Sequence, residues 1–151
     1  FGKELIKIPG LDGTGKMGKS EGNGIYLTDD AKTVEKKVMR AVTDSGPTHE
    51  NQKMSEPIKN LFTILEVVSS QEVVDHFRKQ YNNCTIRYGE LKKQLATDIN
   101  IVLNPIRERF NEFYNNDDYL RKVARMGREK ARESASKTLK DVREIIGIRD
   151  F

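Results

Sequence analysis

Residues 13–20 read Gly-Thr-Gly-Lys-Met-Gly-Lys-Ser, and the interpretation of the whole chain follows from this octet. Its spacing satisfies G-x-x-x-x-G-K-[ST], the pattern of a P-loop that holds nucleotide phosphates. The octet also places Lys16 and Lys19 on a glycine-rich segment, which predicts a mobile loop that presents two cations. Both interpretations predict phosphate binding, but they imply different folds, so the flanking residues have to decide between them.

The flanks of the octet disfavour a P-loop. Such a loop lies between a buried strand and a helix whose N-terminus faces the phosphates. Upstream, residues 4–12 carry polar interruptions and a Pro-Gly pair, unlike the continuous apolar run of a buried parallel strand. Downstream, residues 21–24 read Glu-Gly-Asn-Gly, which is poor helix material. The flanks therefore favour a mobile loop whose lysines stabilise charge on a leaving phosphate group, although a solvated surface loop stays open on the octet alone.

Several further segments carry a family resemblance. Lys16–Ser20 is similar to the Lys-Met-Ser-Lys-Ser signature of class I aminoacyl-tRNA synthetases, with Gly18 where that family usually has Ser. It is followed in order by residues 25–30 (IYLTDD), 36–45 (KKVMRAVTDS), 88–92 (YGELK) and 103–109 (LNPIRER). This series resembles the C-terminal part of the bacterial tryptophanyl-tRNA synthetases and covers nearly the whole chain. The 36–45 segment points to tryptophan, and parts of the tail also resemble the tyrosyl enzymes.

The resemblance implies a fold and a domain organisation. We expect a mainly α chain: a helical bundle of the anticodon-binding type, preceded by a short strand and the phosphate loop from the end of a Rossmann-type catalytic domain. Residues 1–27 would be the edge of that catalytic domain, and residues 28–151 the helical, tRNA-facing domain. The His-Ile-Gly-His motif and the amino-acid pocket of the family precede the phosphate loop and are absent, so we expect a C-terminal fragment that is inactive alone.

The resemblance also implies an activity, that of a tryptophan–tRNA ligase. Such an enzyme uses ATP to activate tryptophan as the adenylate, releases pyrophosphate and transfers tryptophan to tRNA(Trp). Lys16 and Lys19 would be catalytic, within an ATP-binding set of Lys16, Met17, Gly18, Lys19 and Ser20. ATP would enter with Mg²⁺, and we expect no protein-bound metal here. The parent enzyme would be a homodimer without membrane or DNA partners. A tyrosyl relative, a P-loop NTPase fragment and a non-enzymatic RNA-binding module are the alternatives.

Charge is concentrated near the C-terminus. The net charge is +4, and residues 119–149 contain ten Lys or Arg against four Asp or Glu. A cationic stripe at helical spacing suits a polyanion, because phosphates are held by Arg and Lys. Intrahelical pairs with Glu129 and Glu133 would explain the stripe equally well. The candidate tRNA-binding residues are Arg121, Arg125, Arg128 and Arg132, with Arg107 and Arg109 as weaker candidates.

Composition is consistent with a cytoplasmic protein. The single Cys84 cannot form an internal disulfide, which agrees with a reducing compartment, and we expect it to be at least half-buried. No apolar run approaches the roughly 18 residues that a membrane span needs.

Apolar periodicity predicts five helices. The first runs from a cap at Asp29 or Asp30 to Val42, the second from Pro57 with Ser55 as cap, and the third from a Ser69–Glu72 capping box to Tyr81. A long helix spans 88–114 with a kink at Pro105, and a last one ends at Ile146 before Gly147. We expect the last helix to pack tightly along the 88–114 helix through a stripe of small and apolar residues: Leu120, Val123 or Ala124, Gly127, Ala131, Ala135, Leu139, Val142 and Ile146.

Overall fold

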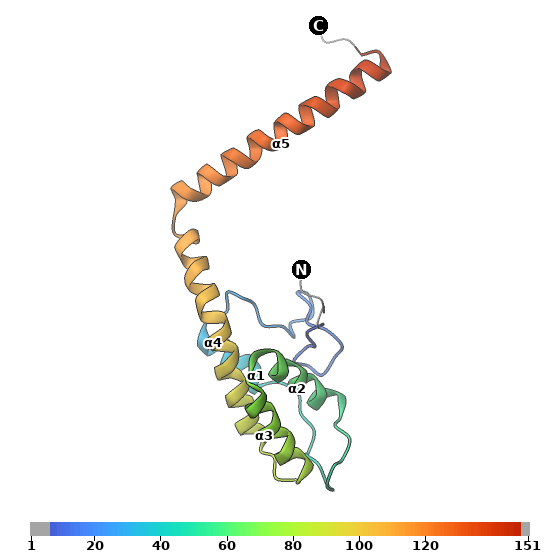
Figure 1. Cartoon of the computed structure of the whole chain (residues 1–151), viewed down its shortest axis with the longest axis vertical. Helices are drawn as coiled ribbons and strands as arrows, with labels where there is room; N and C mark the ends of the chain where they lie inside the picture. The colour runs from blue at the N-terminus through green and yellow to red at the C-terminus, as the bar shows by residue number, and fades with distance from the viewer. Residues whose placement is uncertain (1–6, 149–151) are drawn as a thin grey trace. The chain divides into compact units, whose positions relative to one another are not determined.

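Five helices account for the regular structure of the chain (Figure 1). The computed structural model describes residues 7–148. The helices are α1 (Ala31–Met39), α2 (Glu56–Val68), α3 (Gln71–Asn82), α4 (Tyr88–Tyr114) and α5 (Asp117–Ile146). The remaining described residues form turns and loops without a strand, so the mainly α class is confirmed. Most of the strand predicted at residues 4–8 lies outside the described range. No helix within that range is long and apolar enough to cross a membrane.

The chain divides into two compact units, Phe1–Arg107 and Glu108–Phe151. In the first unit, α1, α2 and α3 lie beside the first part of α4 (Figure 1). Its core draws on all four helices and on Leu11 of the glycine-rich segment, which packs that segment onto the helices. The core residues are Leu11, Val34, Val38, Ala41, Ile58, Leu61, Phe62, Ile64, Leu65, Val74, Phe77, Tyr81, Leu91, Leu95, Ala96, Ile99 and Leu103. The proposed domain boundary at residue 27 stays a prediction.

Helix α1 begins where the sequence predicts and ends earlier. The Asp30 side chain accepts a hydrogen bond from the Thr33 N–H, which satisfies one of the free donors of the first turn. The helix stops at Met39 instead of Val42, because the Val42 N–H donates to the Leu11 carbonyl at 2.9 Å. This bond ties the end of α1 to the glycine-rich segment.

The predicted capping box at Ser69–Glu72 is not formed. Ser70 is the N-cap of α3, and its side chain makes no capping bond. The hydroxyl of Ser69 instead donates to the Asp98 carboxylate of α4 at 2.6 Å. Ser55 is the N-cap of α2 as predicted, yet its hydroxyl also bonds elsewhere, to Asp44. In both places a carboxylate distant in sequence competes successfully with the local cap.

Helix α5 lies in the second unit. Its bounds agree with the prediction: Asn116 caps it through the Tyr119 N–H at 3.0 Å, and Gly147 ends it at a φ of 75°. None of its residues is buried, however, and a Cβ at Gly127 would meet nothing within 4 Å. The predicted packing of its small-residue stripe against the 88–107 part of α4 stays a prediction, because that part of α4 belongs to the first unit and α5 to the second. Stacking of Phe113 on Tyr119, with ring centroids 5.0 Å apart, joins α4 to α5 inside the second unit.

Two segments that carry the family resemblance meet at the start of α4. Tyr88 donates its hydroxyl to Asp44 at 2.6 Å, and the buried Lys92 donates its Nζ to the Ala41 carbonyl at 2.7 Å. Asp44 also accepts from the Ser55 hydroxyl and the Gly46 N–H. The connection between α1 and α2 is a loop anchored at this carboxylate.

The hydrogen bonds to Asp44 set its ionisation. Burial by itself would raise the pKa of this carboxyl, but the bonds from Ser55, Tyr88 and Gly46 outweigh burial and lower its pKa below 3.8. Burial, followed by the bond to the carboxylate, raises the pKa of Tyr88. Burial likewise lowers the pKa of Lys92, whose ammonium faces backbone carbonyls. The cluster therefore holds an ionised carboxylate beside a neutral phenol.

Removing one donor to Asp44 should destabilise the first unit. We expect Tyr88→Phe to lower the free energy of unfolding by about 1.5–3 kcal/mol, because the lost bond is made to a charged acceptor. Urea unfolding at pH 7, followed by near-ultraviolet circular dichroism, measures the change. Tyr114→Phe is the matched control, since Tyr114 is 65% exposed.

Acid should remove most of that difference. A carboxyl with a lowered folded-state pKa contributes stability above its unfolded value of 3.8, and this contribution is lost as the pH falls through the folded-state pKa. The two proteins should therefore begin to converge in stability below pH 3.8 and should converge fully only below the folded-state pKa of Asp44. A Tyr88→Phe cost that is the same at pH 7 and in acid would contradict the assignment to Asp44.

Candidate functional site

The backbone of residues 10–24 folds back on itself through its own hydrogen bonds. The Gly10 N–H donates to the Thr14 carbonyl at 3.3 Å, and the Leu11 N–H donates to the Asn23 carbonyl at 3.0 Å. Gly13 and Gly22 have φ values of 83° and 67°, which L side chains rarely adopt. The two ends of the 10–24 segment are thus brought together by turns that contain glycines with positive φ.

Asn23 occupies the centre of this loop and is 5% exposed. Its Nδ2 lies 3.1 Å from each carboxylate oxygen of Asp12, 3.2 Å from the Thr14 hydroxyl and 3.1 Å from the Lys16 carbonyl. Its Oδ1 accepts from the Gly18 N–H at 2.9 Å. One side chain therefore links the beginning, the middle and the end of the octet.

Asp12 supplies the negative charge at the base of the loop. The Thr14 hydroxyl and backbone N–H donate to it at 2.7 and 3.0 Å. Those bonds, and then the one from Asn23, lower the pKa of Asp12. The ionised carboxylate can only accept hydrogen bonds, so it faces the amide nitrogen of Asn23.

The predicted ATP-binding residues separate into exposed and anchored positions. Lys16, Lys19 and Ser20 are exposed, whereas Met17 and Gly18 are half-buried. Met17 packs against the core, and its N–H donates to the Ile8 carbonyl at 3.1 Å. The loop therefore presents both lysines to solvent from an anchored backbone.

Tyr26 connects the second lysine to α1. Its hydroxyl donates to the Lys19 carbonyl at 3.3 Å, and Lys37 Nζ lies 4.4 Å from the centre of its ring. Lys37 also pairs with Asp29 at 2.5 Å, and Asp29 accepts from the Tyr26 N–H. Sequence reasoning missed Asp12, Asn23 and Tyr26. The only signal for them was their place beside the octet.

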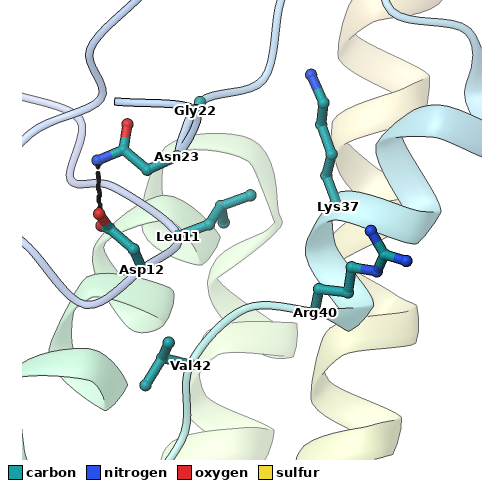
Figure 2. A pocket seen from close by; sticks show the side chains of 8 residues that line it. Leu11, Asp12, Gly22, Asn23, Lys37, Arg40 and Val42 are labelled. Carbon is teal, nitrogen blue, oxygen red and sulfur yellow. Dashed lines mark hydrogen bonds between the residues drawn. The ribbon is translucent and has the colours of Figure 1, made fainter. Parts of the chain in front are cut away.

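A pocket of about 350 Å³ lies between this loop and α1 (Figure 2). Figure 2 shows the bonded pair Asp12 and Asn23 on one side and Lys37 and Arg40 of α1 on the other. The lining residues are Leu11, Asp12, Gly22, Asn23, Gly24, Lys37, Arg40 and Val42.

The geometry after the octet excludes a P-loop. That motif requires a helix that begins at the lysine and serine of the pattern, so that its N–H groups reach the phosphates. Here Lys19 and Ser20 lie in a turn, and the next helix begins only at Ala31. A helix N-terminus is therefore not available at this loop for the phosphate contacts that the sequence predicts.

The candidate tRNA-binding arginines differ in their surroundings. Arg107, in the first unit, is half-buried and donates to the Asn100 side chain at 2.6 Å. Arg109 pairs with Glu112 and lies over the Phe113 ring.

The four stripe arginines on α5 are all exposed. Arg121 lies 4.0 Å from Asp117. Within residues 7–148, no ion pair joins the stripe to Glu129 or Glu133. The alternative explanation through those two intrahelical pairs is thus not observed.

These features fit the lysine-bearing loop predicted from the resemblance to class I aminoacyl-tRNA synthetases and do not fit a P-loop protein. The family model of tRNA synthetases class I (W and Y) matches residues 6–104, and the chain belongs to that family.

The chain is similar in sequence to named tryptophan–tRNA ligases. The chain is 60% identical over 148 residues to a tryptophan–tRNA ligase of Porphyromonas gingivalis, covering 98% of this chain and 45% of that protein. It is 37% identical over 150 residues to the tryptophan–tRNA ligase of Clostridium longisporum, covering 96% and 43%. The chain therefore spans less than half the length of these relatives.

A solved structure shares the arrangement. It is the tryptophanyl-tRNA synthetase of Campylobacter jejuni in complex with ADP and tryptophan, with a TM-score of 0.78 and 26% sequence identity. The match covers 97% of this chain and 45% of that one.

The loop leaves no space for a side chain at Gly10. A Cβ at this position would lie 2.4 Å from Asn23 Nδ2 and 2.5 Å from Asp12 Oδ1. We expect Gly10→Ala to displace that pair at a cost of about 1–3 kcal/mol, as in an overpacked core. Amide hydrogen exchange should become faster at Gly18, whose N–H depends on Asn23. Gly15→Ala is the matched control, because a Cβ there meets nothing within 4 Å. Equal protection at Gly18 in both variants would show that the space is not limiting.

Proposed function

We propose that this chain is the C-terminal part of a tryptophan–tRNA ligase. The enzyme activates tryptophan with ATP and then transfers it to tRNA(Trp). The observation that carries this proposal is the 60% identity to the tryptophan–tRNA ligase of Porphyromonas gingivalis. The identity extends over 98% of the chain and includes the loop that carries Lys16 and Lys19. The chain alone should be inactive, because it spans 45% of that relative.

The loop would act on the phosphates of ATP. The tryptophan carboxylate attacks the α-phosphorus, the bond to the β-phosphate oxygen breaks, and pyrophosphate leaves with the added charge. Lys16 and Lys19, both exposed on the anchored loop, would contact the β- and γ-phosphates and stabilise that charge. The exposed Ser20 hydroxyl can add a hydrogen bond. The Gly18 N–H is already bonded to Asn23, so Gly18 would contribute to ATP binding by its small size.

Further components belong to the same proposal. Mg²⁺ would enter with ATP, and residues 7–148 contain no group of three side chains suited to holding a metal. We place the enzyme in the cytoplasm as a homodimer, with tryptophan, ATP and tRNA(Trp) as its partners.

The arginines of α5 would contact tRNA. A row of exposed guanidinium groups suits the phosphates and unstacked bases of an anticodon stem-loop. Arg121, Arg125, Arg128 and Arg132 recur at steps of three and four along one helix face. Arg107 and Arg109 would contribute less, because both already have partners.

Amino-acid-dependent exchange between ATP and pyrophosphate tests the activity. We expect the full-length protein that carries this chain to catalyse exchange with tryptophan alone. Lys19→Ala should lower the rate by about 10²-fold or more, since it removes a cation from the transition state. Lys79→Ala, on the exposed surface of α3, is the control. Exchange with tyrosine would reassign the substrate, and ATP hydrolysis without any exchange would contradict the proposal.

Salt dependence tests the arginine stripe. Replacing the four arginines by alanine should weaken tRNA binding and lower the slope of log K against log salt by up to about 3.6, at about 0.7–0.9 per lost phosphate contact. A control variant removes the same charge from another face of α5. Its substitutions are Lys122→Ala, Lys130→Ala, Lys137→Ala and Lys140→Ala. Equal slopes for the two variants would mean that only net charge matters.

A further inference from the structure

The orientation of the buried Asn23 amide is fixed by chemistry. The Asp12 carboxylate can only accept hydrogen bonds, so the Nδ2 group must face it. The Gly18 N–H can only donate, so Oδ1 must face that amide, as observed at 2.9 Å. A flipped side chain would place oxygen against a carboxylate and nitrogen against an N–H. One rotamer therefore satisfies both partners.

This single orientation holds the backbone between the two lysines. Asn23 bonds the carbonyl of Lys16 and the N–H of Gly18, which are the groups on either side of Met17. The Met17 N–H is held in turn by Ile8, and its side chain packs on the core. The main chain from which both lysine side chains extend is thus fixed from within the fold.

We propose that Asn23 is a positioning residue for activation of the amino acid. Resting on the proposed function, this inference extends it to a residue that is 5% exposed and whose side chain is hydrogen-bonded to Asp12 and to the loop backbone. Asn23 acts through the backbone at Met17 and holds the ammonium groups of Lys16 and Lys19 where the phosphates of ATP need them. Its effect belongs to the rate of the chemical step, because misplaced catalytic groups lower the rate without removing the pocket for the amino acid.

Substitution of Asn23 in the full-length protein tests the inference. In Asn23→Asp a carboxylate faces Asp12 and the donor to Lys16 is lost, while Asn23→Ala removes all of the bonds. Both variants should lower the turnover of ATP–pyrophosphate exchange by about 10²-fold, while the KM for tryptophan stays within about threefold. Asn60→Ala is the matched control. Its amide donates to the Thr14 carbonyl at 3.0 Å, away from Met17, and its loss should cost about threefold or less.

A reciprocal exchange separates positioning from stability. In the double variant Asn23→Asp, Asp12→Asn, the new amide at position 12 can donate to the new carboxylate, which still accepts from Gly18. We expect it to regain about tenfold of the turnover that Asn23→Asp loses, measured well below the melting temperature of every variant. A residue that only stabilises the fold would change melting temperatures and leave turnover at such temperatures unchanged.

The outcomes separate the two proposals. If the unsubstituted protein exchanges with tryptophan but Asn23→Asp and Asn23→Ala keep its turnover, the positioning role is overturned and the proposed function stands. If the unsubstituted protein shows no exchange with any amino acid, the proposed function fails and the positioning role fails with it. Amide exchange at Gly18 gives a readout apart from activity: protection that survives Asn23→Ala would also overturn the inference.

Discussion

The half-buried carboxylate of Asp44 is the junction on which the first unit depends. It receives hydrogen bonds from Ser55 at the start of α2 and from Tyr88 at the start of α4. Lys92, one turn further along α4, reaches the carbonyl of Ala41 at the end of α1. A charge that is partly removed from water needs such partners, so the starts of α2 and α4 have to meet here. The Val42 N–H donates a hydrogen bond to the Leu11 carbonyl, and this bond connects the cluster to the loop of residues 10–24.

In the loop of residues 10–24, which carries Lys16 and Lys19 and is called the lysine loop here, buried and exposed residues have different roles. The buried side chain of Asn23 fixes the loop backbone through hydrogen bonds to Asp12, to Thr14 and to the backbone on both sides of Met17. The exposed side chains of Lys16 and Lys19 extend into solvent from the same backbone. A loop built in this way can carry glycines for its turns and still present its charges in a defined place. Under the proposed function, those charges would contact the phosphates of ATP.

Helix positions could be read from the sequence to a large extent, whereas tertiary hydrogen bonds could not. Apolar spacing placed α2, α3, α4 and α5 within a few residues, because period 3.6 is a local property. The predicted capping box at Ser69 does not form, because the Ser69 hydroxyl donates instead to Asp98, which is distant in sequence. Cys84 was expected to be at least half-buried and is exposed. The two lysines were identified from a local pattern, but the residues that hold them were not, since the partners of Asn23 are defined only by the folded loop.

Helix α5 gives the chain an uneven resistance to heat. Thirty residues form this helix and contacts inside the second unit bury none of them, so within that unit its stability rests on caps, local ion pairs and intrinsic propensity. Helices that lack tertiary packing melt gradually, whereas a packed core unfolds in one cooperative step. The helical signal of this chain will therefore fade over a broad range of temperature before the aromatic signal of the first unit is lost. A single melting temperature describes the core around Tyr81 and not the whole chain.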